Sequence, residues 1–343
     1  MSSPPRTDGP TNRNAPTWFP RHFGDQPPPP PPAVDLPTAY ATALRLHRGC
    51  PPVAGEGYRL YTMTAAQFAS RDVLAGGASF AILGRHTACN VVLAGDASIA
   101  LRHVLVECTV LDDGCPRLSV LDLESDHGFL LANGTFERSI VAAGPIAFRV
   151  GAYAVVALPG GVPLPEALPV PACDRADGRA LPLRAPVPVP PSSHGAPVPS
   201  GAAPMSRITL LPRAMVLSER PTLGVVPHAG SPACDYELSL ASAGGRVSVY
   251  LSVAELERGL LVGRANKCLD AGLRSVLNIG ISRVHLLLLR DAAGCRAYDI
   301  ASTQGTYRDG RSVRRASLED EGTRLVLGAV SGIGLSWRRM GPG

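Results

Sequence analysis

The stretch "DIASTQGT" at residues 299–306 decides the fold, because a related stretch, "DLESDHGF", occurs earlier at residues 122–129. The two are 177 residues apart (299 − 122). Other residues match in the same order, at separations of 177 (328 − 151) to 182 (285 − 103). These pairs are Gly84-Arg85 with Gly263-Arg264, Cys89 with Cys268, His103 with His285, Gly114-Cys115 with Gly294-Cys295, and Gly151-Ala152 with Gly328-Ala329. An ordered series with a nearly constant offset predicts two copies of one fold.

Short apolar runs broken by turn residues fill both segments that carry these motifs. "YRLYTMT", "FAILGR" and "LSVLDL" lie within residues 57–158, and "YELSLAS", "RVHLLLLR" and "RLVLGAVSGIGLSW" lie within residues 234–339. Short strands at this spacing predict an all-β sandwich for each segment. Residues 159–233, between them, are rich in proline and alanine, which predicts a long, mostly disordered linker.

The N-terminal region is expected to contain a tail and one short helix. Residues 1–34 are rich in proline and polar residues, a composition that predicts a disordered, partly polyproline tail. This tail is either a stiff spacer or a ligand for a proline-recognition domain. In the connector, residues 35–56, Asp35 is placed to cap a helix over residues 36–48 that ends at Gly49.

The formal net charge of +5 is unevenly distributed. Residues 55–158 carry 7 Arg against 10 Asp and Glu (7 − 10 = −3), and residues 234–343 carry 15 Lys and Arg against 11 Asp and Glu (15 − 11 = +4). Only the C-terminal half therefore favours an acidic or phosphorylated partner by its mean charge. The excess is too small to indicate nucleic-acid binding.

The eight cysteines form no Cys-x-x-Cys pair and lack the close His/Cys clustering of a zinc site. We expect reduced thiols in a cytoplasmic protein with no metal and no cofactor. The matched Cys89 and Cys268 are expected to fill the same place in each copy. The sequence contains no apolar signal region and no run of about eighteen apolar residues, so it predicts neither a signal peptide nor a membrane span.

Taken in order, the motifs resemble those of the forkhead-associated (FHA) family. The second copy has Gly263-Arg264 closing a strand, "SRVH" at residues 282–285 and "DIASTQGT" at residues 299–306, followed by a late apolar strand. The resemblance spans residues 234–339 and, more loosely, 57–158. It implies two FHA-type β-sandwiches joined by the linker, each with loops at one end that could bind a phosphothreonine peptide.

The resemblance places phosphopeptide binding on five residues of the second copy: Arg264, Ser282, Arg283, Thr303 and Gln304. A phosphothreonine presents about −1.5 to −2 charges and three acceptor oxygens. Arg264 can offer two of them a forked pair of donors, and Ser282 can donate its hydroxyl to another. Thr303 lies where the family has a small side chain near the phosphate and the threonine methyl.

Three further residues of the second copy are expected to support the site, namely Gly263, His285 and Gly305. If the strand alternates, His285 points away from the phosphate and braces the loops from inside. Gln304 departs from the family, in which an asparagine side chain usually hydrogen-bonds the ligand backbone. The additional methylene changes the reach of this amide, so binding either survives with altered geometry or fails.

The first copy is more eroded. Arg85 remains, but Ala100 replaces the serine, Asp126 the threonine and His127 the asparagine, while Phe129 follows the glycine. Asp126 places a negative charge where a phosphate would sit. We therefore expect no phosphothreonine binding here, and Arg85 could pair with Asp126. The module would then be an assembly surface, a spacer, or a domain that packs on the other copy.

These features predict a phosphothreonine-peptide-binding adaptor in serine/threonine kinase signalling that acts through the C-terminal module. Its partner would be a phosphothreonine-containing protein, either such a kinase or a kinase substrate. The alternative is a phospho-independent scaffold that uses both sandwiches as interaction modules. No nucleophile accompanies His285, so we expect no enzymatic activity. The sequence leaves the oligomeric state open.

Overall fold

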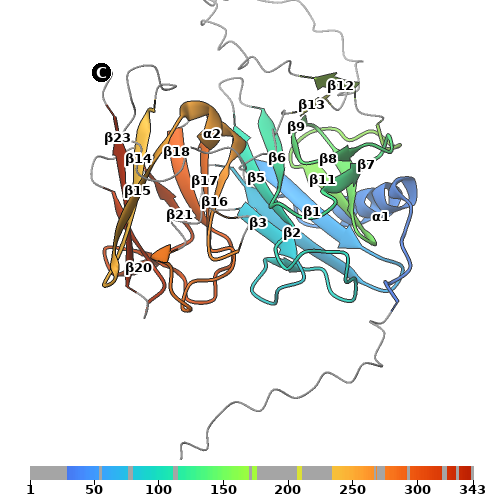
Figure 1. Cartoon of the computed structure of the whole chain (residues 1–343). Coiled ribbons are helices and arrows are strands. Elements are labelled where there is room, and N and C mark those ends of the chain that lie inside the picture. The colour runs from blue at the N-terminus through green and yellow to red at the C-terminus, as the bar shows by residue number, and fades with distance from the viewer. Residues whose placement is uncertain are drawn as a thin grey trace, which may run out of the picture.

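The computed structural model describes residues 29–53, 56–75, 80–110, 115–169, 172–175, 207–210, 234–265, 268, 275–291, 294–318, 323–329 and 332–340. The fold is all-β, as predicted, and contains two sandwiches side by side (Figure 1). Most of the N-terminal tail and most of the predicted linker lie outside the described residues.

The predicted helix is present as α1 (Leu36–Gly49). The Asp35 carboxylate accepts a hydrogen bond from the Thr38 amide at 2.9 Å, which satisfies one of the free amides of the first turn. The apolar side of α1, including Tyr40 and Leu44, packs on the outer face of the first sandwich. The helix therefore covers a sheet face that would otherwise be an exposed apolar surface.

The first sandwich contains two mainly antiparallel sheets with the strand orders β2-β1-β11-β10-β7-β8 and β12-β13-β9-β6-β5-β3-β4. Alternate residues of the strands in both sheets fill its core, as with Val104 of one sheet and Val155 of the other. The strands are β1 (Gly57–Met63), β2 (Phe68–Leu74), β3 (Phe80–Gly84), β4 (Val91–Val92), β5 (Val104–Val110), β6 (Pro116–Asp122), β7 (Phe129–Leu131), β8 (Phe136–Glu137), β9 (Ser139–Ala143), β10 (Ile146–Val150) and β11 (Tyr153–Pro159).

Two short strands of the predicted linker extend this sandwich. β13 (Arg207–Leu210) pairs antiparallel with β9, and β12 (Ala172–Arg175) pairs parallel with β13. Residues closer to β11 also contact the first module, because the Tyr40 hydroxyl donates to the Pro165 carbonyl at 2.8 Å. The sequence did not predict these attachments.

The second sandwich has sheets with the strand orders β15-β14-β23-β22-β19-β20 and β16-β17-β18-β21. The helix α2 (Val253–Arg258) was not predicted, although Ser252 and Glu255 form a capping box at its start. The strands are β14 (Tyr236–Ser242), β15 (Gly245–Leu251), β16 (Leu260–Val262), β17 (Leu286–Asp291), β18 (Gly294–Asp299), β19 (Thr306–Arg308), β20 (Arg311–Val313), β21 (Arg315–Ser317), β22 (Arg324–Leu327) and β23 (Ile333–Arg339).

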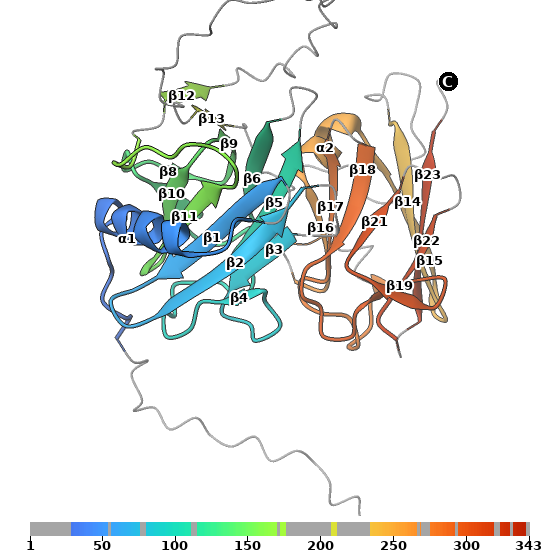
Figure 2. The ribbon, with the colours of Figure 1, turned by 180° about the vertical axis from the view of Figure 1, so that it is seen from behind.

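The two sandwiches pack face to face, so the molecule has four sheet layers. In β16, Leu260 and Val262 point into the core of the second module, while Leu261 between them points to the first module. β3 alternates in the same way. In Figure 2, which shows the molecule from behind, β3 and β5 face β16 and β17. The interface cluster takes six buried side chains from each module: Phe80, Ile82, Cys89, Leu105, Leu121, Leu123, Leu261, Cys268, Val284, Leu287, Tyr298 and Ile300.

A buried carboxylate lies within this apolar interface. Glu107 of β5 is only 2% exposed. It accepts hydrogen bonds from Arg315 and from the Tyr298 hydroxyl, both at 2.8 Å, and from Arg296 at 3.2 Å. Burial and this carboxylate raise the pKa of Tyr298. Of the three roles considered for the first module, the structure therefore shows packing on the other copy.

Cys89 and Cys268, which match in the two copies, occupy equivalent turns at the interface. The amide of each donates to the carbonyl three residues earlier at 2.9 Å, and each thiol lies 3.3 Å from a carbonyl oxygen, that of Leu101 for Cys89 and that of Arg283 for Cys268. This confirms that each fills the same place in its copy. Burial raises the pKa of Cys89 to about 11, so its thiol is protonated at neutral pH.

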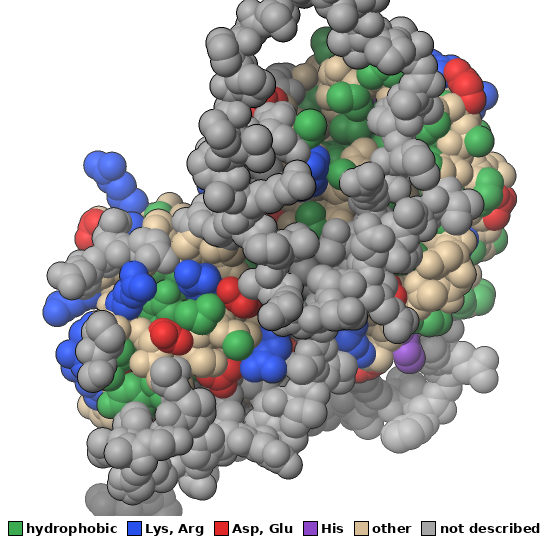
Figure 3. Space-filling model, turned by 90° about the horizontal axis from the view of Figure 1, so that it is seen from above, with side chains coloured by type: hydrophobic (Ala, Val, Ile, Leu, Met, Phe, Trp, Pro, Cys, Tyr) green, Lys and Arg blue, Asp and Glu red, His purple; other side chains and the backbone are tan. Residues whose placement is uncertain are grey.

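The outer surface differs between the modules. Seen from above, basic side chains are visible mainly over the second module (Figure 3), in keeping with the charge difference between the halves. Within the described ranges, no helix is both long and apolar enough to cross a membrane, and no group of three or more metal-ligating side chains is found.

Candidate functional site

Arg264 lies two residues after the end of β16, with Gly263 between them. The residue before it, Gly263, must be a glycine, because a Cβ at that position would lie 2.3 Å from the Arg283 carbonyl oxygen. The Arg264 amide donates to the Ser282 carbonyl at 3.3 Å, and its Nε donates to the Ile281 carbonyl. The side chain is exposed, and in the described part of the chain its terminal nitrogens have no partner. The guanidinium group is therefore held through its Nε, and its terminal nitrogens face solvent.

Ser282 and Thr303 bring the two flanking loops together. The Ser282 hydroxyl oxygen accepts from the Thr303 amide at 2.9 Å and lies 3.4 Å from the Thr303 hydroxyl. Ser282 is largely buried, whereas Thr303 is exposed. Because the Ser282 carbonyl also binds the Arg264 amide, Arg264 and the two hydroxyl groups lie at the same end of the sandwich.

His285 links the same loops from inside. It is fully buried, its Nδ1 accepts from the Ser282 amide at 3.4 Å, and its Nε2 lies 3.1 Å from the Gly305 carbonyl oxygen. Burial lowers the pKa of His285, and the Asp299 carboxylate, 3.9 Å from Nε2, opposes this shift. A neutral imidazole that donates to Gly305 fits all of these contacts.

Asp299 organises the loop between β18 and β19, a role that the sequence analysis did not assign. Its carboxylate accepts from the Ser302 amide at 2.8 Å, from the Ser302 hydroxyl at 2.6 Å and from the Thr306 hydroxyl at 2.7 Å. These bonds fix the turn that carries Thr303. The spacing Asp-x-x-Ser was the available signal, because an aspartate often accepts bonds from residues a few positions later.

Gln304 and Arg283, the two other predicted contacts, have different settings. Arg283 is exposed beside Ser282. The Gln304 amide oxygen is buried and has no hydrogen-bond partner among the described residues, so it is turned into the loop and not toward solvent. In this conformation, an incoming peptide could not reach that oxygen, despite the additional methylene of the Gln304 side chain.

The first module holds its arginine in the same pose. The Arg85 amide donates to the Ala100 carbonyl at 3.1 Å, and its Nε donates to the Ile99 carbonyl. Ala100 offers no hydroxyl, and Asp126 and His127 are exposed. The predicted ion pair between Arg85 and Asp126 is wrong, because these two side chains make no contact with each other in the described part of the chain.

One substitution in the first module, Phe129 where the second has Thr306, removes a polar group from its loops. Phe129 is buried and packs against Phe148 with ring centroids 5.3 Å apart, so this position serves the core. Arg138 donates to the Asp122 carboxylate at 2.6 Å and to the Ser125 carbonyl at 2.9 Å. The Arg138 contacts hold this loop from within.

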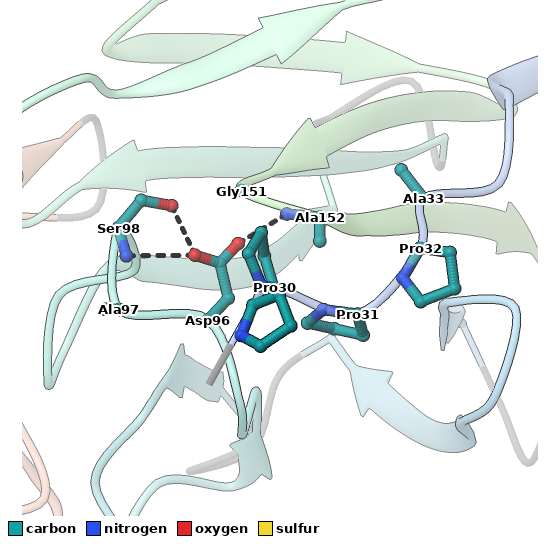
Figure 4. Close-up of a pocket in the computed structure, with 10 residues that line it drawn as sticks. Pro30, Pro31, Pro32, Ala33, Asp96, Ala97, Ser98, Gly151 and Ala152 are labelled. Atoms are coloured by element: carbon teal, nitrogen blue, oxygen red, sulfur yellow. Dashed lines mark hydrogen bonds between the residues drawn. The ribbon is translucent and has the colours of Figure 1, made fainter. Parts of the chain in front are cut away.

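A separate pocket lies where the proline run passes the first module (Figure 4). Pro29–Ala33 form one wall, and Asp96, Ser98 and Ala152 line the other. The Asp96 carboxylate accepts from the Ser98 amide at 2.9 Å, from the Ser98 hydroxyl at 2.6 Å and from the Ala152 amide at 2.7 Å. A pocket with apolar walls and a carboxylate does not suit a phosphate.

No protein-family model and no curated protein match the chain. Solved structures match about a third of it. The FHA domain of the CT664 protein from Chlamydia trachomatis is 18% identical over 30% of this chain and 96% of that chain, with a TM-score of 0.26. The Rv1747 FHA-1 domain of Mycobacterium tuberculosis is 23% identical over 31% of this chain and 97% of that chain, with a TM-score of 0.23. The yeast Dun1 FHA domain, in complex with a doubly phosphorylated peptide, is 13% identical over 34% of this chain and 83% of that chain, with a TM-score of 0.27.

Since these identities are below 25%, the assignment rests on the molecule itself. Apart from β4, β12 and β13, the strands of the two halves pair in the same order. Both halves also have a Gly-Arg strand end and a buried histidine, and His103 and His285 each lie against the carbonyl of the equivalent glycine, Gly128 or Gly305. These repeated contacts show two copies of one β-sandwich fold, and the motifs of both copies resemble those of the FHA family.

Proposed function

We propose that the chain is a phosphothreonine-peptide-binding adaptor in serine/threonine kinase signalling and that its C-terminal module makes the contact. The observation that carries the proposal is the convergence of the exposed Arg264 fork with the Ser282–Thr303 hydroxyl pair. A site of this kind needs a cation with free donors beside neutral donors, and these three residues supply both.

Each group has a distinct task toward the phosphate. The terminal nitrogens of Arg264 donate to two phosphate oxygens, because the Nε anchor on Ile281 fixes the plane of the fork. The Ser282 hydroxyl turns from Thr303 to a third oxygen. Hydrogen bonds to charged groups contribute about 1.5–3 kcal/mol each. After the cost of ordering a peptide, affinity in the micromolar range is expected, which suits reversible signalling.

The expected partner is a protein that carries a phosphothreonine, either a serine/threonine kinase or its substrate. The cytoplasm is the predicted compartment, on the basis of the cysteine usage in the sequence. No cofactor and no catalytic step form part of the proposal, since binding alone would couple a phosphorylation event to assembly.

A degenerate phosphothreonine peptide library tests the proposal, with unphosphorylated and phosphoserine libraries as controls. The full chain is the right reagent, because the isolated segment 230–343 would expose Leu261, Leu287 and Tyr298 of the interface. Selective retention of phosphothreonine peptides supports the proposal. Equal retention of all three libraries, or none, would overturn it.

The alternative remains a phospho-independent scaffold. Two observations favour it: the inward-turned Gln304 amide oxygen and the large interface that uses a whole sheet face of each module. A scaffold would bind its partner equally well before and after phosphatase treatment of that partner. The library experiment therefore separates the two proposals.

A further inference from the structure

One buried arginine of the first module reaches into the loop of the second module. Arg102 precedes β5 and is only 7% exposed. Its Nε donates to the Ile300 carbonyl and its Nη2 to the Ala301 carbonyl. No carboxylate pairs with it in the described part of the chain. A buried guanidinium is therefore committed to two main-chain oxygens of the other module.

The two acceptors lie where the candidate site is shaped. Ile300 and Ala301 directly follow Asp299 and directly precede Ser302 and Thr303. Ala301 has φ of +50°, in the left-handed region that is unfavourable for alanine. Arg102 binds the carbonyls of Ala301 and of the residue before it. The clamp therefore stabilises the bend that sets the direction of Thr303.

The second module has no arginine at the position equivalent to Arg102. Ala100 and Ser282 occupy equivalent positions, as do His103 and His285, so the counterpart of Arg102 is Val284. Val284 lies in the apolar interface cluster and has no side-chain donor. The first module thus holds the recognition loop of the second module through a side chain that has no counterpart at position 284.

The charge of Arg102 also acts on the candidate site. Burial lowers the pKa of Arg102, the Asp299 carboxylate opposes that shift, and Arg283 adds to it. Arg102 likewise helps to lower the pKa of His285. It therefore interacts electrostatically with three residues of the second module's loops, although it belongs to the other sandwich.

We propose that Arg102 is a positioning residue for the phosphothreonine site of the C-terminal module, and that this is the role of the degenerate first module in recognition. The proposal rests on the proposed function above. Apparent affinity falls with the fraction of protein whose loop is in the binding conformation. Loss of the clamp lowers that fraction without removing any group that touches the ligand.

The affinity test uses full-length Arg102→Val, which installs the residue that the second copy has at this position. We expect its dissociation constant for a library-selected phosphothreonine peptide to rise about tenfold, with Arg102→Lys restoring part of the affinity. If the valine variant does not fold, Arg102→Met fills the same space without donors and carries the same expectation. Affinity within about twofold of wild type would overturn the proposal.

Glu107→Gln is the matched control, because it weakens the same interface away from the loop. It should lower the melting temperature and leave peptide affinity unchanged. If Glu107→Gln and Arg102→Val reduce affinity equally, the effect is general loosening of the interface, and Arg102 has no positioning role.

Amide hydrogen exchange in the free protein gives a second readout that needs no ligand. We expect Arg102→Val to speed exchange at Ser302 and Thr303 relative to wild type, while Glu107→Gln does not. Unchanged exchange at these amides contradicts the clamp. Should wild type bind no phosphothreonine peptide, the proposed function fails, yet this readout still decides whether Arg102 orders the loop.

Discussion

Arg85 and Arg264 close equivalent strands and are held in the same pose, but only Arg264 lies beside hydroxyl groups. In the second module, Ser282 and Thr303 meet at the arginine, whereas the first module has Ala100 and Asp126 there. The comparison shows that the arginine pose is a property of the fold. The neighbouring side chains determine whether that pose makes an anion site.

The largest expected effect concerns the contact that makes the two modules one body. Glu107→Ala leaves Arg296 and Arg315 without their shared carboxylate, and we expect the free energy of unfolding to fall by about 3 kcal/mol. Urea denaturation measures this. Glu237→Ala, which removes a pair with the exposed Arg338, is the control and should change stability by about 0–1 kcal/mol. Equal losses would mean that the interface carries no special stability.

Arg264→Ala should weaken phosphothreonine-peptide binding at least about 100-fold, because two charge-assisted hydrogen bonds are lost. Arg85→Ala, its counterpart in the first module, should leave the dissociation constant within about twofold. Calorimetric titration of both variants measures the difference. Similar behaviour of the two would show that the assignment of roles to the modules is wrong.

Ser282→Ala gives the second module the residue of the first at this position. We expect affinity to fall about tenfold, since one hydroxyl donor to a charged oxygen is lost. The reciprocal change Ala100→Ser is the control and should have no effect on binding. Fluorescence anisotropy with a labelled peptide suffices for both, and an unaffected Ser282→Ala variant would remove the hydroxyl from the proposed site.

The buried His285 predicts a pH dependence of stability. Its pKa is lowered in the folded state, mainly by burial, so protonation favours the unfolded chain. Its contribution is fully present above the unfolded pKa of about 6.5 and is lost as the pH falls below that value. Thermal melts between pH 7.5 and pH 5 should show a smaller decline for His285→Gln than for wild type. An identical decline would indicate that other groups dominate.

The smallest effect is expected from rebuilding the first module. With Ala100→Ser and Asp126→Thr in an Arg264→Ala background, any phosphopeptide binding must come from Arg85. We expect only weak binding, at least about tenfold weaker than that of the wild-type second module, because His127 and Phe129 are unchanged. Binding as tight as wild type would mean that these two positions alone distinguish the modules.

The sequence predicted the two sandwiches and α1, since motif order, strand periodicity and the Asp35 cap are local signals. It left packing between the modules as one of three alternatives and did not predict the interface residues, although Leu260, Leu261 and Val262 are all apolar and such a strand needs a partner on both faces. The partner is a distant part of the chain, which local pattern does not specify. Arg102 was missed for the same reason: its acceptors are main-chain oxygens some 198 residues away.

The most direct test is a nuclear magnetic resonance titration of the full chain with a selected phosphothreonine peptide. The amide signals of Arg264, Ser282 and Thr303 should shift with the peptide, and those of Arg85 and Ala100 should stay in place. Shifts confined to the loops of the first module, or spread over faces remote from Arg264, would contradict a phosphate site in the second module.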